Sequence, residues 1–151
     1  MKYLISTSIL LIYLLSAQLH AQCDQDSQTL FSCKIKKSGK LLEVCDAGKT
    51  INYTFGKVDK KPELSLSVSR DKVSTYQWAG VGRYENYSVI IPSGKATYNV
   101  FWGVDKLAKG YPEDAGVTVE IKDEEVARIL CVNKTVVHNL IDVDLKPVEY
   151  E

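Results

Sequence analysis

The sequence predicts an all-β domain: a small antiparallel barrel or sandwich of eight to nine short strands, held by disulfide bonds. Three observations support this prediction. Apolar and polar residues alternate with period two through most of the chain, turn-forming residues interrupt the alternation at short intervals, and four cysteines follow an apolar N-terminal segment. No convincing helical stripe is present, apart from a possible helical turn at Val104 to Lys109.

The first 21 residues have the pattern of a secretory signal peptide. Lys2 precedes an apolar run from Leu4 to Leu15, which is too short to span a bilayer, and Ala21 offers a small residue for cleavage. We therefore expect a signal peptide at 1–21, a single domain at 22–151 and no stable membrane span. Lipid attachment at Cys23 is the less favoured alternative, because Gln22 is not the small residue that a lipoprotein signal requires. The expected location is periplasmic or secreted.

Charge excludes one class of partner. The chain has 19 basic and 19 acidic residues and a formal net charge of +0, without the basic stripe that neutralises phosphates. A nucleic-acid partner is therefore not expected, and no motif calls for a cofactor.

The alternation places the earlier strands with some precision. Apolar residues alternate with polar ones in three segments typical of half-buried antiparallel strands: Ile51 to Phe55, Leu64 to Val68, and Val117 to Ile121. Two more strands, Phe31 to Lys37 and Leu41 to Cys45, are expected to form a hairpin around Ser38-Gly39-Lys40. The remaining expected strands are Val73 to Trp78, Tyr84 to Ile91, Ala96 to Trp102, Glu125 to Val132 and Val136 to Leu145.

The four cysteines, Cys23, Cys33, Cys45 and Cys131, are expected to form two disulfides in one of three pairings. A three-residue hairpin loop would place Cys33 opposite Cys45, which favours that pair and leaves Cys23 for Cys131. The competing arrangement joins Cys45 to Cys131 and closes a much longer loop. A metal site is not expected, since no Cys-x-x-Cys pair occurs.

Catalytic residues are scarce, and we expect a protein that is not an enzyme. His138 is the one histidine after the signal segment, and the alternation places it with Val136 and Leu140 as a packed histidine. No nucleophile elbow is present, and the acidic pairs fall in turns. An enzyme would need His138 beside a carboxylate in a cleft.

An aromatic stretch from Tyr76 to Tyr111 is the strongest candidate for a binding region. It contains both tryptophans, Trp78 and Trp102, and the small-residue segment Ala79-Gly80-Val81-Gly82 followed by Arg83 and Tyr84. Tyrosine, tryptophan and arginine dominate binding hot spots, whereas glycine allows close approach of a partner. The alternative is a β-bulge with all the aromatic side chains in the core.

Several short motifs resemble the periplasmic and membrane-bound inhibitors of C-type lysozyme, over roughly Cys45 to Cys131. They are Val44-Cys45-Asp46-Ala47-Gly48-Lys49-Thr50, the segment Ala79 to Tyr84, the pair Phe101-Trp102, and Lys109-Gly110. The resemblance implies an eight-stranded antiparallel barrel that plugs the active-site cleft of a host lysozyme. It also implies that Ala79 to Tyr84 form the plugging loop and that Lys106 or Lys109 faces the catalytic carboxylates of the lysozyme.

The sequence departs from that family at several points. Ala79 stands where the family has a loop serine, and Val104 to Ala108 form an insertion before Lys109. A Cys33–Cys45 pair would also remove the disulfide of the family. The expected function is therefore an exported, non-enzymatic envelope protein that binds a protein or a glycan, with lysozyme inhibition as its most specific form. The expected partner-binding residues are Ala79, Gly80, Val81, Gly82, Arg83, Tyr84, Trp102, Lys106 and Lys109. The alternative function is a structural or accessory periplasmic domain whose aromatic side chains are all core.

Overall fold

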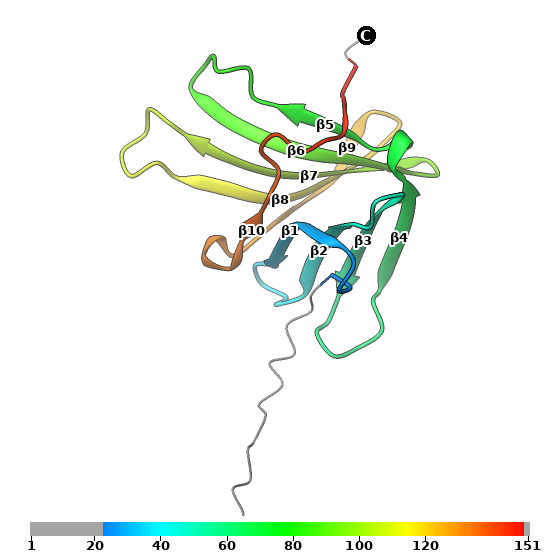
Figure 1. The fold of residues 1–151 in the computed structure, drawn as a ribbon. Helices are drawn as coiled ribbons and strands as arrows, with labels where there is room; N and C mark the ends of the chain where they lie inside the picture. The colour runs from blue at the N-terminus through cyan, green and yellow to red at the C-terminus, as the bar shows by residue number, and fades with distance from the viewer. Residues whose placement is uncertain (1–22, 150–151) are drawn as a thin grey trace, which may run out of the picture.

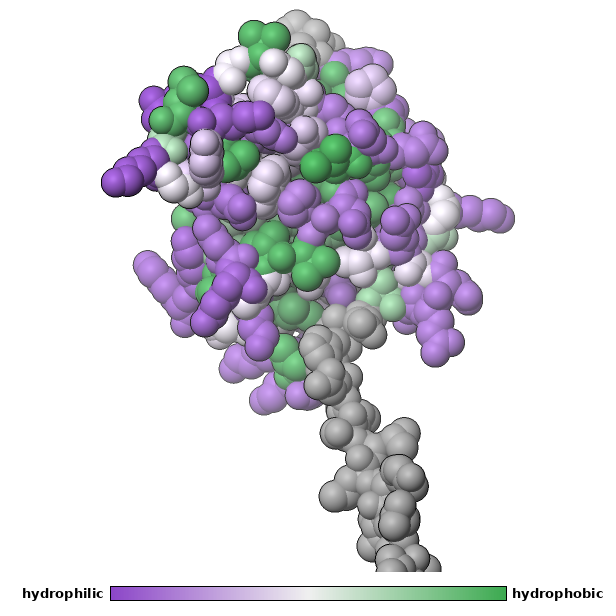
Figure 2. All heavy atoms as spheres, turned by 60° about the vertical axis from the view of Figure 1, so that its left-hand side comes forward, coloured by the Kyte–Doolittle hydropathy of each residue, from purple (hydrophilic) through white to green (hydrophobic). Residues whose placement is uncertain are grey.

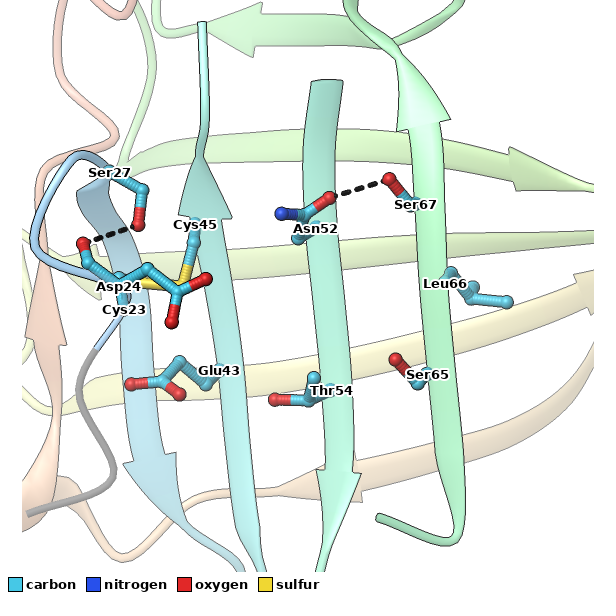
Figure 3. Close-up of a pocket in the computed structure, with 10 residues that line it drawn as sticks. All are labelled: Cys23, Asp24, Ser27, Glu43, Cys45, Asn52, Thr54, Ser65, Leu66 and Ser67. Carbon is cyan, nitrogen blue, oxygen red and sulfur yellow. Dashed lines mark hydrogen bonds between the residues drawn. A yellow bond between two sulfur atoms is a disulfide. The ribbon is translucent and has the colours of Figure 1, made fainter. Parts of the chain in front are cut away.

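The computed structural model describes residues 23–149, which form two β-sheets packed face to face as a sandwich (Figure 1). The strands of one sheet cross those of the other steeply (Figure 3). The predicted signal peptide at 1–21 lies outside the described residues. Within them, no helix is long and apolar enough to cross a membrane.

The first sheet has the strand order β10-β1-β2-β3-β4, and every pairing in it is antiparallel. Its strands are β1 (Gln28–Lys34), β2 (Leu41–Asp46), β3 (Thr50–Gly56), β4 (Leu64–Ser69) and β10 (Val137–His138). Burial alternates along β3 and β4 as predicted, because one face of the sheet is buried, whereas four consecutive residues of β2 are buried.

The second sheet has the order β11-β5-β6-β7-β8-β9. Its centre is a long antiparallel meander, whereas the short β11 pairs with β5 in parallel. The strands are β5 (Ser74–Gln77), β6 (Tyr84–Ser93), β7 (Ala96–Asp105), β8 (Glu113–Ile121), β9 (Glu124–Leu130) and β11 (Lys146–Pro147). Two short 3-10 helices, η1 (Arg70–Lys72) and η2 (Asn133–Thr135), lie between strands.

One continuous hydrophobic core fills the space between the sheets. Phe31, Val44 and Ile51 of the first sheet and Val89 and Val117 of the second are fully buried in it. Tyr53 and Tyr98 meet across the sandwich with their ring centroids 5.2 Å apart. Burial raises the pKa of the Tyr53 hydroxyl well above its usual value.

The two sheets meet by backbone hydrogen bonds at one corner. Ile35 and Cys131 form an isolated antiparallel bridge. On either side of it, the Lys36 amide donates to the Leu130 carbonyl and the Val132 amide donates to the Lys34 carbonyl. Ladder pairing does not continue around the described residues, so the sheets do not close into a barrel. Of the two predicted architectures, the sandwich is confirmed. The eight-stranded barrel implied by the family resemblance is not what the described strands form.

The disulfides differ from both predicted arrangements. Cys23 is bonded to Cys45, and Cys33 is bonded to Cys131. The predicted β1–β2 hairpin exists, but its loop is longer than three residues, so Cys33 lies opposite Leu42. Lys37 and Gly39, both with positive φ, allow the longer turn. Within this register Cys33 is 1 % exposed and lies inside the core.

The predicted strand from Val136 to Leu145 is mostly wrong. Only Val137 and His138 pair with β1, after which the chain leaves the sheet. Gln77 takes the place of a partner strand, since its side-chain amide donates to the Leu140 carbonyl and accepts from the Asp142 amide. These bonds satisfy the backbone locally without a β-ladder.

Candidate functional site

Two loops lie side by side at one end of the six-stranded sheet, on the left of Figure 1. The first, residues 78–83, joins β5 to β6, and the second, residues 106–112, joins β7 to β8. Tyr84 at the start of β6 pairs with Asp105 at the end of β7, which brings the loops together. We call them the loop pair. The structure therefore places Ala79 to Tyr84, Lys106 and Lys109 at one end of the molecule.

A carboxylate holds the two loops in a fixed relation. The Arg83 guanidinium donates from Nε to both oxygens of Asp105, at 2.7 and 2.8 Å, and a further nitrogen lies 2.7 Å from Oδ2. Asp105 also accepts the backbone amides of Leu107 and Ala108, and the Lys106 amide donates to the Arg83 carbonyl. The hydrogen bonds from Arg83 are the main reason that the pKa of Asp105 falls to about 2.

Lys106 contacts the first loop and is not a free cation. Its ammonium is 2.9 Å from Oε2 of Glu85 and 4.6 Å from the centre of the Trp78 ring. The hydrogen bond from Lys106 lowers the pKa of Glu85. Trp78 in turn donates its indole N–H to the Val81 carbonyl at 2.9 Å, and this hydrogen bond stabilises the turn within the loop.

The glycines of the first loop have distinct backbone roles. Gly80 and Gly82 have φ values of 82° and 99°, in the region that favours glycine, and a Cβ at either position would meet open space. The segment is therefore an exposed turn with two left-handed positions. It is a loop between β5 and β6, and the bulge proposed as the alternative is not formed.

Trp102 lies in a different environment from the loop pair. It points from β7 toward the core, where its ring stacks on His138 at 4.4 Å and on Tyr87 at 6.3 Å. Its indole N–H donates to Oε2 of Glu113 at 3.3 Å. Trp102 is half-buried and supports the sheet below the loops, so the structure separates it from the exposed members of the predicted site.

The tips of the loop pair carry three large apolar side chains in solvent. Val81 is 81 % exposed, Leu107 is 76 % exposed and Tyr111 is 65 % exposed. Figure 2 brings this side of the molecule forward and shows hydrophobic residues (green) among hydrophilic ones (purple). Sequence reasoning named Val81 but missed Leu107 and Tyr111 as site residues. The signal was present, since both flank Lys109 within a short turn.

Two other predicted site residues are also exposed. Tyr84 is 40 % exposed and rests on Gly103, where an added Cβ would lie 2.6 Å from its ring. Lys109 is exposed and forms no ion pair with any described residue. Burial thus divides the aromatic stretch: Arg83 and Tyr84 are accessible, whereas Trp78 and Trp102 are partly covered.

Two groups of side chains bear on catalytic and metal chemistry: His138, which lines a hollow that also contains Asp142 and Asp144, and the cluster around Cys23 and Cys45. His138 packs against Trp102, its Nδ1 is buried without a hydrogen-bond partner, and burial lowers its pKa. The side chains of Cys23, Glu43 and Cys45 come together in metal-binding proximity. However, both sulfurs belong to one disulfide and so cannot act as thiolate ligands.

Comparisons of the chain with protein-family models, with curated proteins and with solved structures give no match.

Proposed function

We propose that this protein is an exported binding protein that inserts the loop pair into a cleft of a protein partner. The proposal is based on one observation: the loop pair exposes apolar side chains at its tips, while hydrogen bonds at its base keep both loops ordered. Val81, Leu107 and Tyr111 lie in solvent, while the Arg83–Asp105 contacts hold the loops that carry them. Loops already ordered in the free protein lose less conformational entropy when they bind.

A protein partner is favoured over a glycan by the state of the aromatic rings. Sugar rings stack on flat, accessible aromatic faces. Lys106 lies over the Trp78 ring, and His138 and Tyr87 stack with Trp102, so neither tryptophan offers a free platform. The exposed tips are two aliphatic side chains and one tyrosine, which suit a hydrophobic protein pocket better.

The most specific form of the proposal is inhibition of a lysozyme. Its support is the resemblance in the short motifs, two of which, Ala79 to Tyr84 and Lys109-Gly110, lie on or directly beside the loop pair. Lys109 would supply the positive charge facing the catalytic carboxylates, because Lys106 is already paired with Glu85. The two disulfides suit the oxidising compartment in which such an inhibitor would work.

The test is a titration of the oxidised protein into C-type, goose-type and invertebrate-type lysozymes acting on bacterial cell walls. Dose-dependent inhibition of one class would support the lysozyme proposal. No inhibition of any class would overturn that specific form. Affinity capture from envelope and host extracts would then test the broader claim of a protein partner.

The residues are tested with tip variants that leave the Arg83–Asp105 contacts intact. We expect Leu107→Ser and Tyr111→Ser each to weaken partner binding at least about tenfold, the effect of losing a hot-spot side chain. Val126→Ser is the matched control, because Val126 is 56 % exposed on β9, away from the loop pair. Equal losses in all three variants would show that the tips are not the binding surface.

The double variant Arg83→Ala with Tyr84→Ala tests the base of the loops. We expect it to abolish partner binding while the thermal unfolding temperature stays close to that of the wild type. Arg83 is 60 % exposed at its side chain, so the fold depends little on it. Unchanged affinity in this variant would remove the first loop from the binding surface.

A further inference from the structure

The five-stranded sheet has one long strand with a free side. β4 pairs with β3 only, and it lies at the right-hand margin of the sheet in Figure 1 and Figure 3. Its sequence, Leu-Ser-Leu-Ser-Val-Ser, contains no charged residue and no proline. An unpaired strand edge is a template for pairing with another chain. β4 is therefore a candidate interaction surface, on a different sheet from the loop pair.

The other three edge strands are protected against such pairing. β10 and β11 contain two residues each, and β11 includes Pro147. β9 carries Glu124, Glu125 and Arg128, and its pairing with β8 contains a register shift. Short length, proline, charge and bulges are the usual features that keep sheet edges from pairing. Among the described edge strands, β4 alone combines six residues with none of these features.

Backbone hydrogen bonds show which groups of β4 face its free side. The Arg70 amide donates to the Lys49 carbonyl at 3.0 Å. This bond flanks the paired residues Thr50 and Ser69, which are therefore a non-hydrogen-bonded pair. Because the two kinds of pair alternate along antiparallel strands, the amides and carbonyls of the serines in β4 point away from β3. Among the described residues, no backbone hydrogen bond outside the β-ladders involves these serines.

We infer that two copies of this protein dimerise by antiparallel pairing of their β4 strands across a two-fold axis. With Leu66 of each copy on the axis, Ser65 of one copy lies opposite Ser67 of the other, and each outward amide meets an outward carbonyl. Ser69 stays outside the pairing because it leads into η1. The two five-stranded sheets then form one continuous sheet. The loop pair stays free in each copy, since its strands belong to the other sheet.

The chemistry of β4 favours a second copy over a strand of another protein. An uncharged strand meets no like charge when it is placed against itself, and it has no charge by which to select a foreign partner. Side chains also match across the axis, because Leu66 faces Leu66 on one side of the sheet and serine faces serine on the other. Ser67 donates its hydroxyl to Asn52 at 2.8 Å, so its oxygen can still accept from Ser65 of the second copy.

Sedimentation velocity of the oxidised protein at about 1 μM to 1 mM tests the dimer. A single pair of edge strands buries less area than a standard protein interface, so we expect dimers to form in the upper part of this range. Amide hydrogen exchange locates the contact. Exchange at Ser65 and Ser67 should slow as the protein concentration rises, whereas exchange along β9 should not change.

Two variants of Ser67 disrupt the edge in different ways. Ser67→Pro removes an amide that makes no bond to β3, so we expect an unfolding temperature close to that of the wild type and a dimer at least tenfold weaker. Ser67→Lys keeps every backbone group and adds a charge to each copy, which should weaken the dimer by a similar factor. The lysine variant keeps the test decisive if the proline variant fails to fold.

Two matched controls separate the edge from the side chain and from added charge. Ser67→Ala removes the hydroxyl but keeps the outward amide and carbonyl, and it should dimerise like the wild type. Ser32→Lys places a lysine on the same face of the sheet, but on β1, three strands away from β4. It should also leave the dimer intact.

Several results would overturn the inference. They are a monomer at the highest concentration, a dimer that both disruptive variants leave intact, and slowed exchange at a surface other than β4. A further result would do the same: a chain that stays monomeric while a synthetic peptide of alternating valine and threonine slows exchange at Ser65 and Ser67. The edge would then accept strands of other proteins and not a second copy.

Discussion

Asp105 is the residue on which the geometry of the loop pair depends most directly. It accepts from the Arg83 side chain of one loop and from the Leu107 and Ala108 amides of the other. A carboxylate with this many donors is strongly stabilised in its charged form. The same side chain therefore shapes both loops and stays ionised in moderately acidic solution.

This arrangement predicts a pH dependence with a definite sign. The pKa of Asp105 is about 2 in the folded protein, below the usual value of 3.8. Its stabilising effect is thus fully present above about pH 4 and is lost as the pH falls through 2. We expect the Asp105 carboxyl carbon to titrate near pH 2 by NMR, with the loop amides shifting at the same pH. A midpoint near 4 would mean that the Arg83 contacts do not persist in solution.

A matched pair of variants extends this argument from the pKa to binding. Asp105→Asn removes the charge that Arg83 contacts, and we expect faster hydrogen exchange at the Leu107 and Ala108 amides and weaker partner binding. Asp123→Asn is the control, since Asp123 lies in the β8–β9 turn at the opposite end of the sheet. Unchanged exchange in Asp105→Asn would show that the loops are ordered by other contacts.

At the scale of the element, two glycines in neighbouring strands test how tightly the six-stranded sheet is packed. A Cβ at Gly116 of β8 would lie 2.0 Å from the Ile129 carbonyl oxygen, which belongs to the rigid backbone of β9. A Cβ at Gly103 of β7 would instead meet the end of the Tyr84 ring, which can rotate away. Backbone clashes relax poorly, whereas side-chain clashes relax easily.

We therefore expect Gly116→Ala to lower the free energy of unfolding by about 2 to 4 kcal/mol and Gly103→Ala by about 1 kcal/mol or less. Urea unfolding of both variants measures the difference. Gly103→Ala should also change the environment of Tyr84, visible in its NMR signals. Similar stabilities for the two variants would contradict the close approach of β9 to Gly116.

The disulfides act on elements that are distant along the chain. Cys33–Cys131 joins residues 98 positions apart, at the corner where the sheets meet, whereas Cys23–Cys45 joins residues 22 apart. In the chain-entropy model these loops correspond to about 4.7 and 3.4 kcal/mol of stabilisation. The double variant Cys33→Ala with Cys131→Ala should therefore unfold at a lower urea concentration than the double variant Cys23→Ala with Cys45→Ala. The opposite order would show that local strain or residual structure outweighs loop length.

Sequence reasoning located elements better than it located their partners. Alternation placed the strands from Ile51 to Val68 because one buried face imposes a period of two. It could not set the β1–β2 register, which depends on the left-handed Lys37 and hence on a longer loop. It also could not foresee that Gln77 would satisfy the backbone after His138. The alternation of apolar and polar residues encodes neither the backbone conformation of Lys37 nor the hydrogen bonds of Gln77.

At the scale of the whole molecule, alternation alone does not distinguish a sandwich from a barrel, because both bury one face of each strand. The difference lies in whether the edge strands pair, and in this protein they do so only at the Ile35–Cys131 bridge within the described residues. The candidate site was likewise predicted in part. The aromatic stretch indicated the loops, but which side chains would be exposed depended on packing against Lys106 and His138.

Because the two sheets share one core, we predict that they unfold as one unit. Both sheets contribute to a single hydrophobic cluster, and Cys33–Cys131 joins them. Trp78 and Trp102 belong to the six-stranded side, so tryptophan fluorescence reports on that sheet, whereas far-UV circular dichroism reports on both. We expect coincident urea transitions by the two probes, as in two-state unfolding. A phase seen by circular dichroism but silent in fluorescence would mean that the five-stranded sheet unfolds independently of the sheet that carries the loop pair.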